Sequence, residues 1–143
     1  MIILDTDVFS FLELPDSPEY LRLSSRIAQL DPPVPVAVTV ITYEEQSRGR
    51  LAAVNSAKTP FQLKQTYTHL LQHIRNYQKI PLLEFDEAAI SIASELRKAK
   101  VRIGTLDLRI ASIAIANNAL LITRNFKDFE HVPHLRIEDW TKP

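Results

Sequence analysis

Three acidic residues lie where an apolar run gives way to a predicted helix, although they are far apart along the chain. Asp5 directly follows a short apolar run, Glu45 follows a β-branched run, and Asp107 lies in the first turn of an alanine-rich segment. Carboxylates that converge in a fold repel one another unless a cation lies between them. An oxygen-only set of ligands suits Mg²⁺ or Mn²⁺, and such an ion polarises a phosphoryl oxygen and generates hydroxide near neutral pH. These residues therefore indicate hydrolysis of a phosphodiester.

Each of these positions also has a purely structural explanation. Thr42-x-x-Glu45 has the pattern of a capping box, with Thr42 as the N-cap of a helix. A carboxylate at Asp107 would be stabilised by the helix dipole, and Asp7 is a candidate N-cap for the short helix that follows it. Asp5 is harder to explain in this way, because an acidic group at the end of a buried strand needs a partner, and a cation is a natural one.

The elements that would position these residues alternate between strands and helices. Strands are predicted at residues 1–4, 34–40, 82–85, 119–123 and 135–137. Helices are predicted at residues 8–14, 18–30, 43–57, 61–78, 87–100 and 106–117, with a helical turn at 126–131. Because the strands read as apolar runs, we expect an α/β fold, a three-layer α/β/α sandwich around a parallel sheet of about five strands. Ligands in such folds bind at the carboxyl ends of the strands, where the three carboxylates are predicted to lie.

The composition limits the classes of function. With a length of 143, residues 1–143 are expected to form a single domain. The chain has no cysteine, which excludes thiolate metal sites and cysteine nucleophiles and fits a cytoplasmic location. It has only 2 glycines, so the glycine-rich phosphate-binding loops of P-loop and Rossmann proteins are excluded. No run approaches the roughly 18 apolar residues of a membrane-spanning helix, so no membrane partner is expected.

The charge is balanced, with 17 basic and 17 acidic residues, so the field of the whole molecule does not attract nucleic acid. A nucleic-acid partner would therefore have to contact a local basic patch. The basic residues in the segments around the predicted site are Arg102, Arg109, Arg124 and Lys127.

Four segments spread over nearly the whole chain carry motif-like sequences. Residues 2–8 read IILDTDV, and residues 39–49 read TVITYEEQSRG. Residues 103–111 read IGTLDLRIA, and residues 121–129 read LITRNFKDF. In this order they resemble the hhLDTN, SVIT-x-x-E-x-x-x-G, IG-x-x-D-x-x-IA and LVTRN-x-x-DF motifs of VapC-type toxins, which belong to the PIN domain family. The second motif selects Glu45 rather than Glu44.

The resemblance implies a PIN domain in which Asp5, Glu45 and Asp107 are the catalytic residues and hold Mg²⁺ or Mn²⁺. It also implies an endoribonuclease that cleaves single-stranded or structured RNA by attack of water at phosphorus. Such a protein would be the toxin of a VapBC-type toxin–antitoxin pair. Its partners would be the RNA, a cognate VapB-type antitoxin that occupies the site, and a second copy of the chain in a homodimer.

Two positions depart from the family pattern. Asp7 stands where many relatives have asparagine, which adds charge to the site. Asn125 stands where some PIN nucleases have a fourth acidic ligand. Either Asn125, through its amide oxygen or through water, or Asp128 would then complete the metal shell. Asp128 is equally a candidate cap for the turn before Phe129.

The predicted helix 61–78 has two further features. An apolar stripe along it would supply part of a dimer interface, although a core-facing stripe is the favoured interpretation of any single amphipathic helix. The stripe consists of Phe61, Tyr67, Leu70, Leu71 and Ile74. His69 and His73 lie one turn apart, a spacing that can bind zinc, but a third ligand is missing. We therefore interpret the two histidines as ordinary surface residues.

The leading alternative function is a catalytically inactive PIN-like module that binds RNA or protein, which the missing fourth acid would permit. Asp5-x-Asp7 also resembles the start of phosphatases in which the first aspartate is a nucleophile, but Phe9 does not fit their motif. A receiver domain is disfavoured because no lysine loop can be identified near the last strand.

Overall fold

The structure is a computed structural model that describes residues 1–143. Its strands are β1 (Ile2–Leu4), β2 (Val36–Thr39), β3 (Leu82–Leu83), β4 (Leu120–Ile122) and β5 (Arg136–Glu138). Its helices are α1 (Thr6–Ser10), α2 (Pro18–Ala28), α3 (Val40–Ser56), α4 (Pro60–Tyr77), α5 (Glu87–Lys98), α6 (Thr105–Ala116) and α7 (Phe126–Phe129), and a short 3₁₀ helix, η1 (Phe11–Glu13), continues α1. None of the helices is both long enough and apolar enough to cross a membrane.

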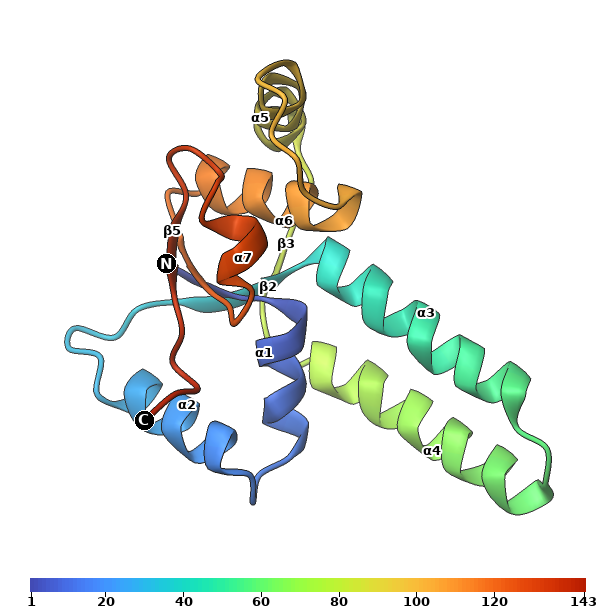
Figure 1. Ribbon diagram of the computed structural model, residues 1–143. Helices are drawn as coiled ribbons and strands as arrows, with labels where there is room; N and C mark the ends of the chain where they lie inside the picture. Colours follow the sequence, from blue (N-terminus) through green and yellow to red (C-terminus); the bar gives the residue numbers. More distant parts are fainter.

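The strands form a parallel sheet in the order β3-β2-β1-β4-β5, which confirms the predicted five-stranded parallel sheet (Figure 1). β1 lies at the centre, where Ile2 is in register with Val36 of β2 and Leu120 of β4. The chain winds from β1 outward to β2 and β3, and then returns to the other side of β1 for β4 and β5. The strand order therefore reverses between β1 and β4, and ligand-binding crevices of α/β folds form at such a point.

Helices cover both faces of the sheet, and each face has its own hydrophobic core (Figure 1). Successive side chains of β1 point to opposite faces. Ile3 packs in a core built with α5 and α6, whereas Ile2 and Leu4 pack in a core built with α1 and α2. The alanine-rich helix α6 is largely buried. The predicted three-layer α/β/α sandwich is thus confirmed.

The starts of α1 and α3 differ from the prediction, because no loop separates these helices from the strands before them. Thr39 ends β2 and is also the N-cap of α3, and its hydroxyl accepts a hydrogen bond from the Thr42 N–H at 3.1 Å. Thr42 therefore lies inside the helix, and the capping box predicted for Thr42 and Glu45 was wrong. Likewise Asp5, not Asp7, is the N-cap of α1. The structural explanations offered for Glu45 and Asp7 no longer hold.

Helices α3 and α4 pack against each other as an arm that projects from the sandwich (Figure 1). The prediction that the apolar stripe of α4 faces the core is wrong for most of its members. Phe61, Tyr67, Leu71 and Ile74 are exposed. The arm extends beyond the sheet, so α3 is the main element available to cover α4, and one neighbouring helix leaves much of an amphipathic face in solvent.

His73 is buried between α4 and α3, which contradicts the prediction of two surface histidines, whereas His69 is exposed as expected. The Nε2 atom of His73 lies 2.8 Å from the Ser47 hydroxyl, and its ring stacks on Tyr43. Burial and the positive charge of Arg50 lower the pKa of His73. The two imidazoles thus lie in different environments, and His73 serves the packing of the arm.

Gly49 offers a test of helix stability, because it lies in the interior of α3 and a Cβ built there meets no atom within 4 Å. We expect Gly49→Ala to raise the free energy of unfolding by about 1 kcal/mol and Tm by about 4 °C, since glycine is a poor residue inside a helix. Thermal and urea denaturation measure both quantities. Gly104→Ala is the matched control: Gly104 is the N-cap of α6, where alanine is a poor cap, so no gain is expected. A Gly49→Ala protein no more stable than wild type would contradict this expectation.

Candidate active site

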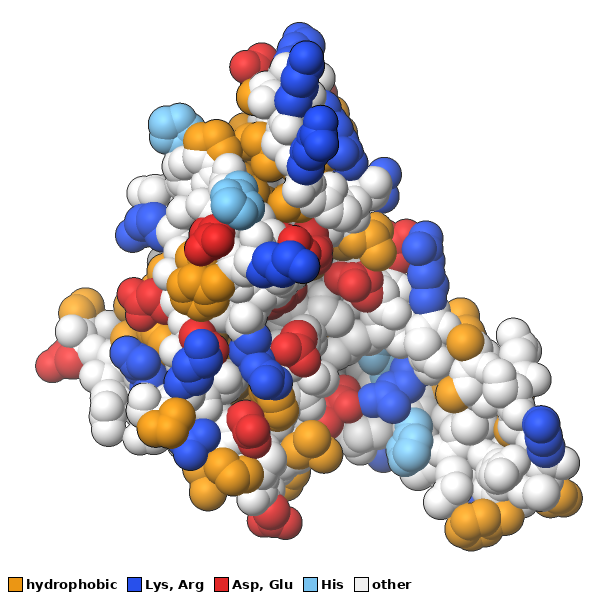
Figure 2. All heavy atoms as spheres, viewed as in Figure 1, with side chains coloured by type: hydrophobic (Ala, Val, Ile, Leu, Met, Phe, Trp, Pro, Cys, Tyr) orange, Lys and Arg blue, Asp and Glu red, His pale blue; other side chains and the backbone are white.

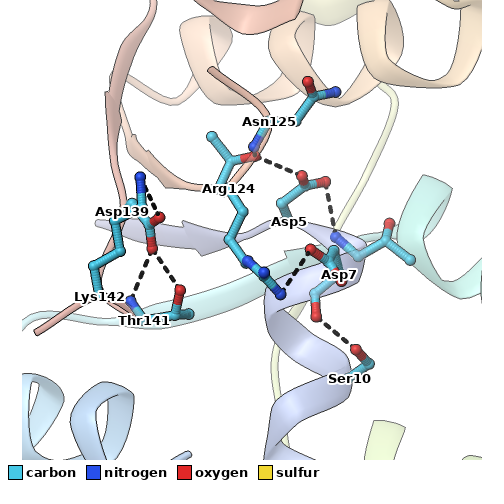
Figure 3. Close-up of polar contacts among 10 residues, drawn as sticks. Asp5, Asp7, Ser10, Arg124, Asn125, Asp139, Thr141 and Lys142 are labelled. Atoms are coloured by element: carbon cyan, nitrogen blue, oxygen red, sulfur yellow. Dashed lines mark hydrogen bonds and ion pairs between the residues drawn. The ribbon is translucent and has the colours of Figure 1, made fainter. Parts of the chain in front are cut away.

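Asp5 stands at the carboxyl end of the central strand, and both of its carboxylate oxygens are hydrogen-bonded (Figure 3). As the N-cap of α1, its Oδ1 accepts a hydrogen bond from the Thr6 N–H at 2.8 Å. Its Oδ2 accepts a hydrogen bond at 2.7 Å from the hydroxyl of Thr123, which follows β4. Asp5 is only 6% exposed. These bonds fix its carboxylate where the strand order reverses.

The surroundings of Asp5 make its negative charge costly. Burial raises the pKa of Asp5, and the charges of Glu45 and Asp7 raise it further, whereas the hydrogen bonds from Thr123 and Thr6 lower it. No basic side chain forms an ion pair with Asp5. The strand end therefore holds a buried carboxylate whose charge lacks a cationic partner within the chain.

Glu45 reaches the same edge from the second turn of α3. Its Oε1 accepts a hydrogen bond from the Thr6 hydroxyl at 2.8 Å. The Thr6 hydroxyl oxygen also lies 3.2 Å from Thr42 Oγ1, so Thr6 joins the start of α1 to the start of α3. Thr6 thus contacts both carboxylates, since its backbone N–H binds Asp5 and its side chain binds Glu45.

Asp107 lies in the first turn of α6 and completes the predicted set of three carboxylates. Burial raises the pKa of Asp107 to about 6, and the charges of Asp5, Glu45 and Asp128 contribute to the shift. No hydrogen bond contributes to this pKa, so Asp107 is held less tightly than Asp5. Because the charges of Asp5 and Glu45 act on Asp107, the three carboxylates lie near one another at one edge of the sheet, as the sequence predicts.

Asn125 and Asp128 lie together at the start of α7. Asn125 is the N-cap, and its Oδ1 accepts a hydrogen bond from the Asp128 N–H at 3.3 Å. Its Nδ2 donates to Asp128 Oδ2 at 3.0 Å. Asn125, rather than Asp128, therefore caps this turn. The two candidate ligands thus bind each other, and the charge of Asp128 contributes to the raised pKa of Asp107.

The acidic side chains gather around a depression near the middle of the face drawn in Figure 2. None of Asp5, Glu45, Asp107 and Asp128 forms an ion pair with a basic side chain. Their donor set consists only of oxygen atoms, which fits Mg²⁺ or Mn²⁺. In their present positions, no three His, Cys, Asp or Glu side chains lie close enough together to hold an ion in common. The chemistry of the donors fits a divalent cation, and side-chain rotation would be needed to close around one.

Two residues of this site, Thr6 and Thr123, were missed by the sequence analysis. Each lies beside a predicted ligand or inside a quoted motif, in Asp5-Thr6 and in Thr123-Arg124-Asn125. The sequence signal that could have identified them is their place just after β1 and β4. Of the basic residues predicted to border the site, Arg124 makes the one ion pair there, with its Nη1 atom 3.7 Å from Asp7 Oδ2 (Figure 3).

A sequence profile of the PIN domain matches residues 2–135. The chain belongs to the PIN domain family. The resemblance to this family that the four motifs indicated is therefore confirmed.

Relatives of this PIN domain include two proteins named as ribonucleases. Ribonuclease VapC1 of Haemophilus influenzae is 29% identical over 140 residues, which cover 98% of each chain. Ribonuclease VapC2 of Rickettsia felis is 47% identical over 51 residues, but this match spans only 38% of that protein and 36% of this chain.

Solved structures similar to this PIN domain include VapBC-1 from nontypeable Haemophilus influenzae. That chain has a TM-score of 0.77 and 27% identity, and the match covers 99% of this chain and 100% of the other. VapBC-5 from Mycobacterium tuberculosis, a member of the VapBC family of toxin–antitoxin systems, has a TM-score of 0.58, 25% identity and 96% coverage of both chains.

Proposed function

We propose that this PIN domain is an endoribonuclease that acts in the cytoplasm as the toxin of a VapBC-type toxin–antitoxin pair. The observation that supports the proposal is that the charges of Asp5, Glu45 and Asp107 act on one another near the point of strand reversal, without a basic partner. The ribonuclease names of relatives that match 98% of the chain support the same activity.

Asp5, Glu45 and Asp107 would hold Mg²⁺ or Mn²⁺, with Asp128 or Asn125 completing the set directly or through water. A bound ion would supply a polarised phosphoryl oxygen and a water of lowered pKa. The identity of the ion and the ligand set are both proposals, and they rest on the oxygen-only chemistry of the donors.

The chain's own residues contribute orientation and charge. Thr123 and Thr6 fix both oxygens of Asp5, and Thr6 also fixes Glu45, so two carboxylates are oriented before any substrate binds. Asp107 makes no such bond, so its carboxylate is not held by a neighbouring donor. Burial and the charges of Asp5, Glu45 and Asp128 raise its pKa to about 6, and a bound cation would relieve this repulsion.

The partners are proposed from the same comparisons. Relatives of known structure are VapBC pairs, and by analogy we propose a cognate VapB-type antitoxin for this chain. A homodimer is proposed as well. The exposed apolar side chains of the α3–α4 arm, among them Phe61, Tyr67 and Leu71, offer surface for such contacts.

The test is cleavage of labelled bacterial RNA by the purified protein, free of antitoxin, in Mg²⁺, in Mn²⁺ and in EDTA. Discrete products with either metal, absent in EDTA, are the expected result. A folded protein that yields no product with either metal would instead favour the inactive RNA- or protein-binding module.

A further inference from the structure

The carboxylates of the proposed site are negatively charged and cannot attract the phosphates of an RNA substrate. The acidic edge repels a phosphate backbone, and the chain as a whole has no net charge to attract one. Affinity for RNA must come from cations next to the edge, because phosphate contacts supply most of the binding free energy. The first such cation by contact is Arg124, 3.7 Å from Asp7.

Arg124 begins a series of basic side chains that are brought together from distant parts of the sequence. Phe126 follows Arg124 by two positions, and the Nζ atom of Lys142 lies 6.0 Å from the centroid of the Phe126 ring. Lys142 in turn lines a shallow hollow of about 430 Å³ with Arg22 and Arg26 of α2. Arg124, Lys142 and Arg26 therefore lie in sequence from the carboxylates, past the start of α7, to α2.

Each exposed cation of this series rests on an aromatic ring. The guanidinium carbon of Arg124 lies 5.2 Å from the centroid of Phe11, and that of Arg26 lies 5.2 Å from the centroid of Trp140. Such contacts hold a cation in a fixed place without neutralising its charge, unlike an ion pair. Basic side chains anchored on aromatic rings are suited to successive phosphates of a single strand.

The hollow is itself fixed by the fold. Arg22 donates a hydrogen bond to the carbonyl oxygen of Thr141 at 3.0 Å, which ties the segment that carries Lys142 to α2. The Lys142 ammonium lies 3.5 Å from Asp139 Oδ2; the lysine side chain is 73% exposed, whereas that of Asp139 is only 5% exposed, so Lys142 presents its charge to solvent from a position set by a buried carboxylate. The side chains of Arg124 and Asp7 are 46% and 58% exposed, so solvent screens their ion pair and a phosphate can replace Asp7 as the partner of Arg124.

We propose that Arg124, Lys142 and Arg26 form a track that binds the phosphates of single-stranded RNA as it leaves the carboxylate edge toward α2. Figure 2 shows basic side chains gathered over α2 and the C-terminal segment, beside the acidic depression on the same face. The proposal rests on the proposed ribonuclease function and names the path of its substrate. It involves residues that no single sequence motif brings together.

The test is binding of a labelled single-stranded RNA to the full chain in EDTA, where cleavage does not interfere. The variant is Arg26→Gln with Lys142→Gln. We expect it to bind at least about tenfold more weakly, and the slope of log K against log salt to fall by about 1.4, since each lost phosphate contact on a single strand removes about 0.7. The matched control is Lys58→Gln with Lys64→Gln, which makes the same charge change at exposed positions on the arm. It is expected to bind as wild type does.

Steady-state cleavage separates binding from a structural effect. The track variant is expected to raise KM for a long RNA and to leave kcat unchanged. The track would be overturned if the track variant bound RNA with the affinity and salt slope of wild type. It would also be overturned if the arm control lost as much affinity as the track variant. If the variant shows these losses of binding but the wild type cleaves no RNA in Mg²⁺ or Mn²⁺, the track is supported and the proposed nuclease function is overturned. A wild type that neither binds nor cleaves overturns both.

Discussion

The Asp107→Asn protein is expected to lose RNA cleavage by about 10³-fold and, without metal, to be more stable than wild type. The loss of rate corresponds to several kcal/mol of transition-state stabilisation at a site of this kind. The gain in stability has a separate cause, because burial and three neighbouring carboxylates raise the pKa of Asp107 from 3.8 to about 6. Removing that charge relieves the repulsion. After allowance for solvent screening, we expect Tm in EDTA to rise by about 4 °C.

The dependence on pH checks this explanation. The pKa of Asp107 is higher in the folded protein than in the unfolded one, so the folded state binds a proton more readily between pH 3.8 and about 6. The destabilisation caused by the ionised group is therefore full above about pH 6 and disappears as the pH falls toward 3.8. In EDTA, the Tm advantage of Asp107→Asn should shrink steadily from pH 7 to pH 4. An advantage independent of pH would mean that repulsion at Asp107 is not its source.

Saturating Mg²⁺ or Mn²⁺ is expected to raise the Tm of the wild type by about 8 °C and to leave Asp5→Asn almost unchanged. At an ion concentration of about 100 times Kd, mass action adds about 2.7 kcal/mol to the free energy of unfolding. The amide in Asp5→Asn keeps the fold intact, because asparagine is as good an N-cap as aspartate and still offers an oxygen to Thr6 or Thr123. Differential scanning calorimetry with and without metal measures the shift.

The matched control for the metal experiment is Asp16→Asn, which removes one exposed carboxylate outside the site. It should respond to the ion as fully as wild type. An equal response in Asp5→Asn would show that the stabilising ion binds elsewhere, and the assignment of the site to the end of β1 would then fail.

Much of the fold was predictable because the signals were local. Ser17 followed by Pro18, and Asp86 before a run of good helix formers, correctly predicted the starts of α2 and α5. The starts of α1 and α3 were not predictable in the same way. Thr39 ends β2 and caps α3, and Asp5 directly follows β1 and caps α1, so the loop that normally marks such a boundary is missing.

The candidate site was predictable at the level of elements and not at the level of contacts. Since parallel strands end at the same edge, residues after β1, β2 and β4 had to meet there. The hydrogen bond from Thr123 to Asp5 spans 118 positions, and no local pattern indicates it. The exposure of the apolar stripe of α4 could not be predicted for a related reason. The spacing of apolar residues shows that one face of a helix is apolar, but it does not show whether another element covers that face.

The position of β1 between β2 and β4 also determines when the proposed site can form during synthesis of the chain. β1 is synthesised well before β4, so one side of this strand has no neighbour until β4 has been made. At about 5–20 residues per second, the 118 positions between Asp5 and Thr123 take about 6 to 24 s to synthesise. Throughout that interval the carboxylate edge is incomplete, so the growing chain lacks the site proposed for RNA cleavage until β4 has been made.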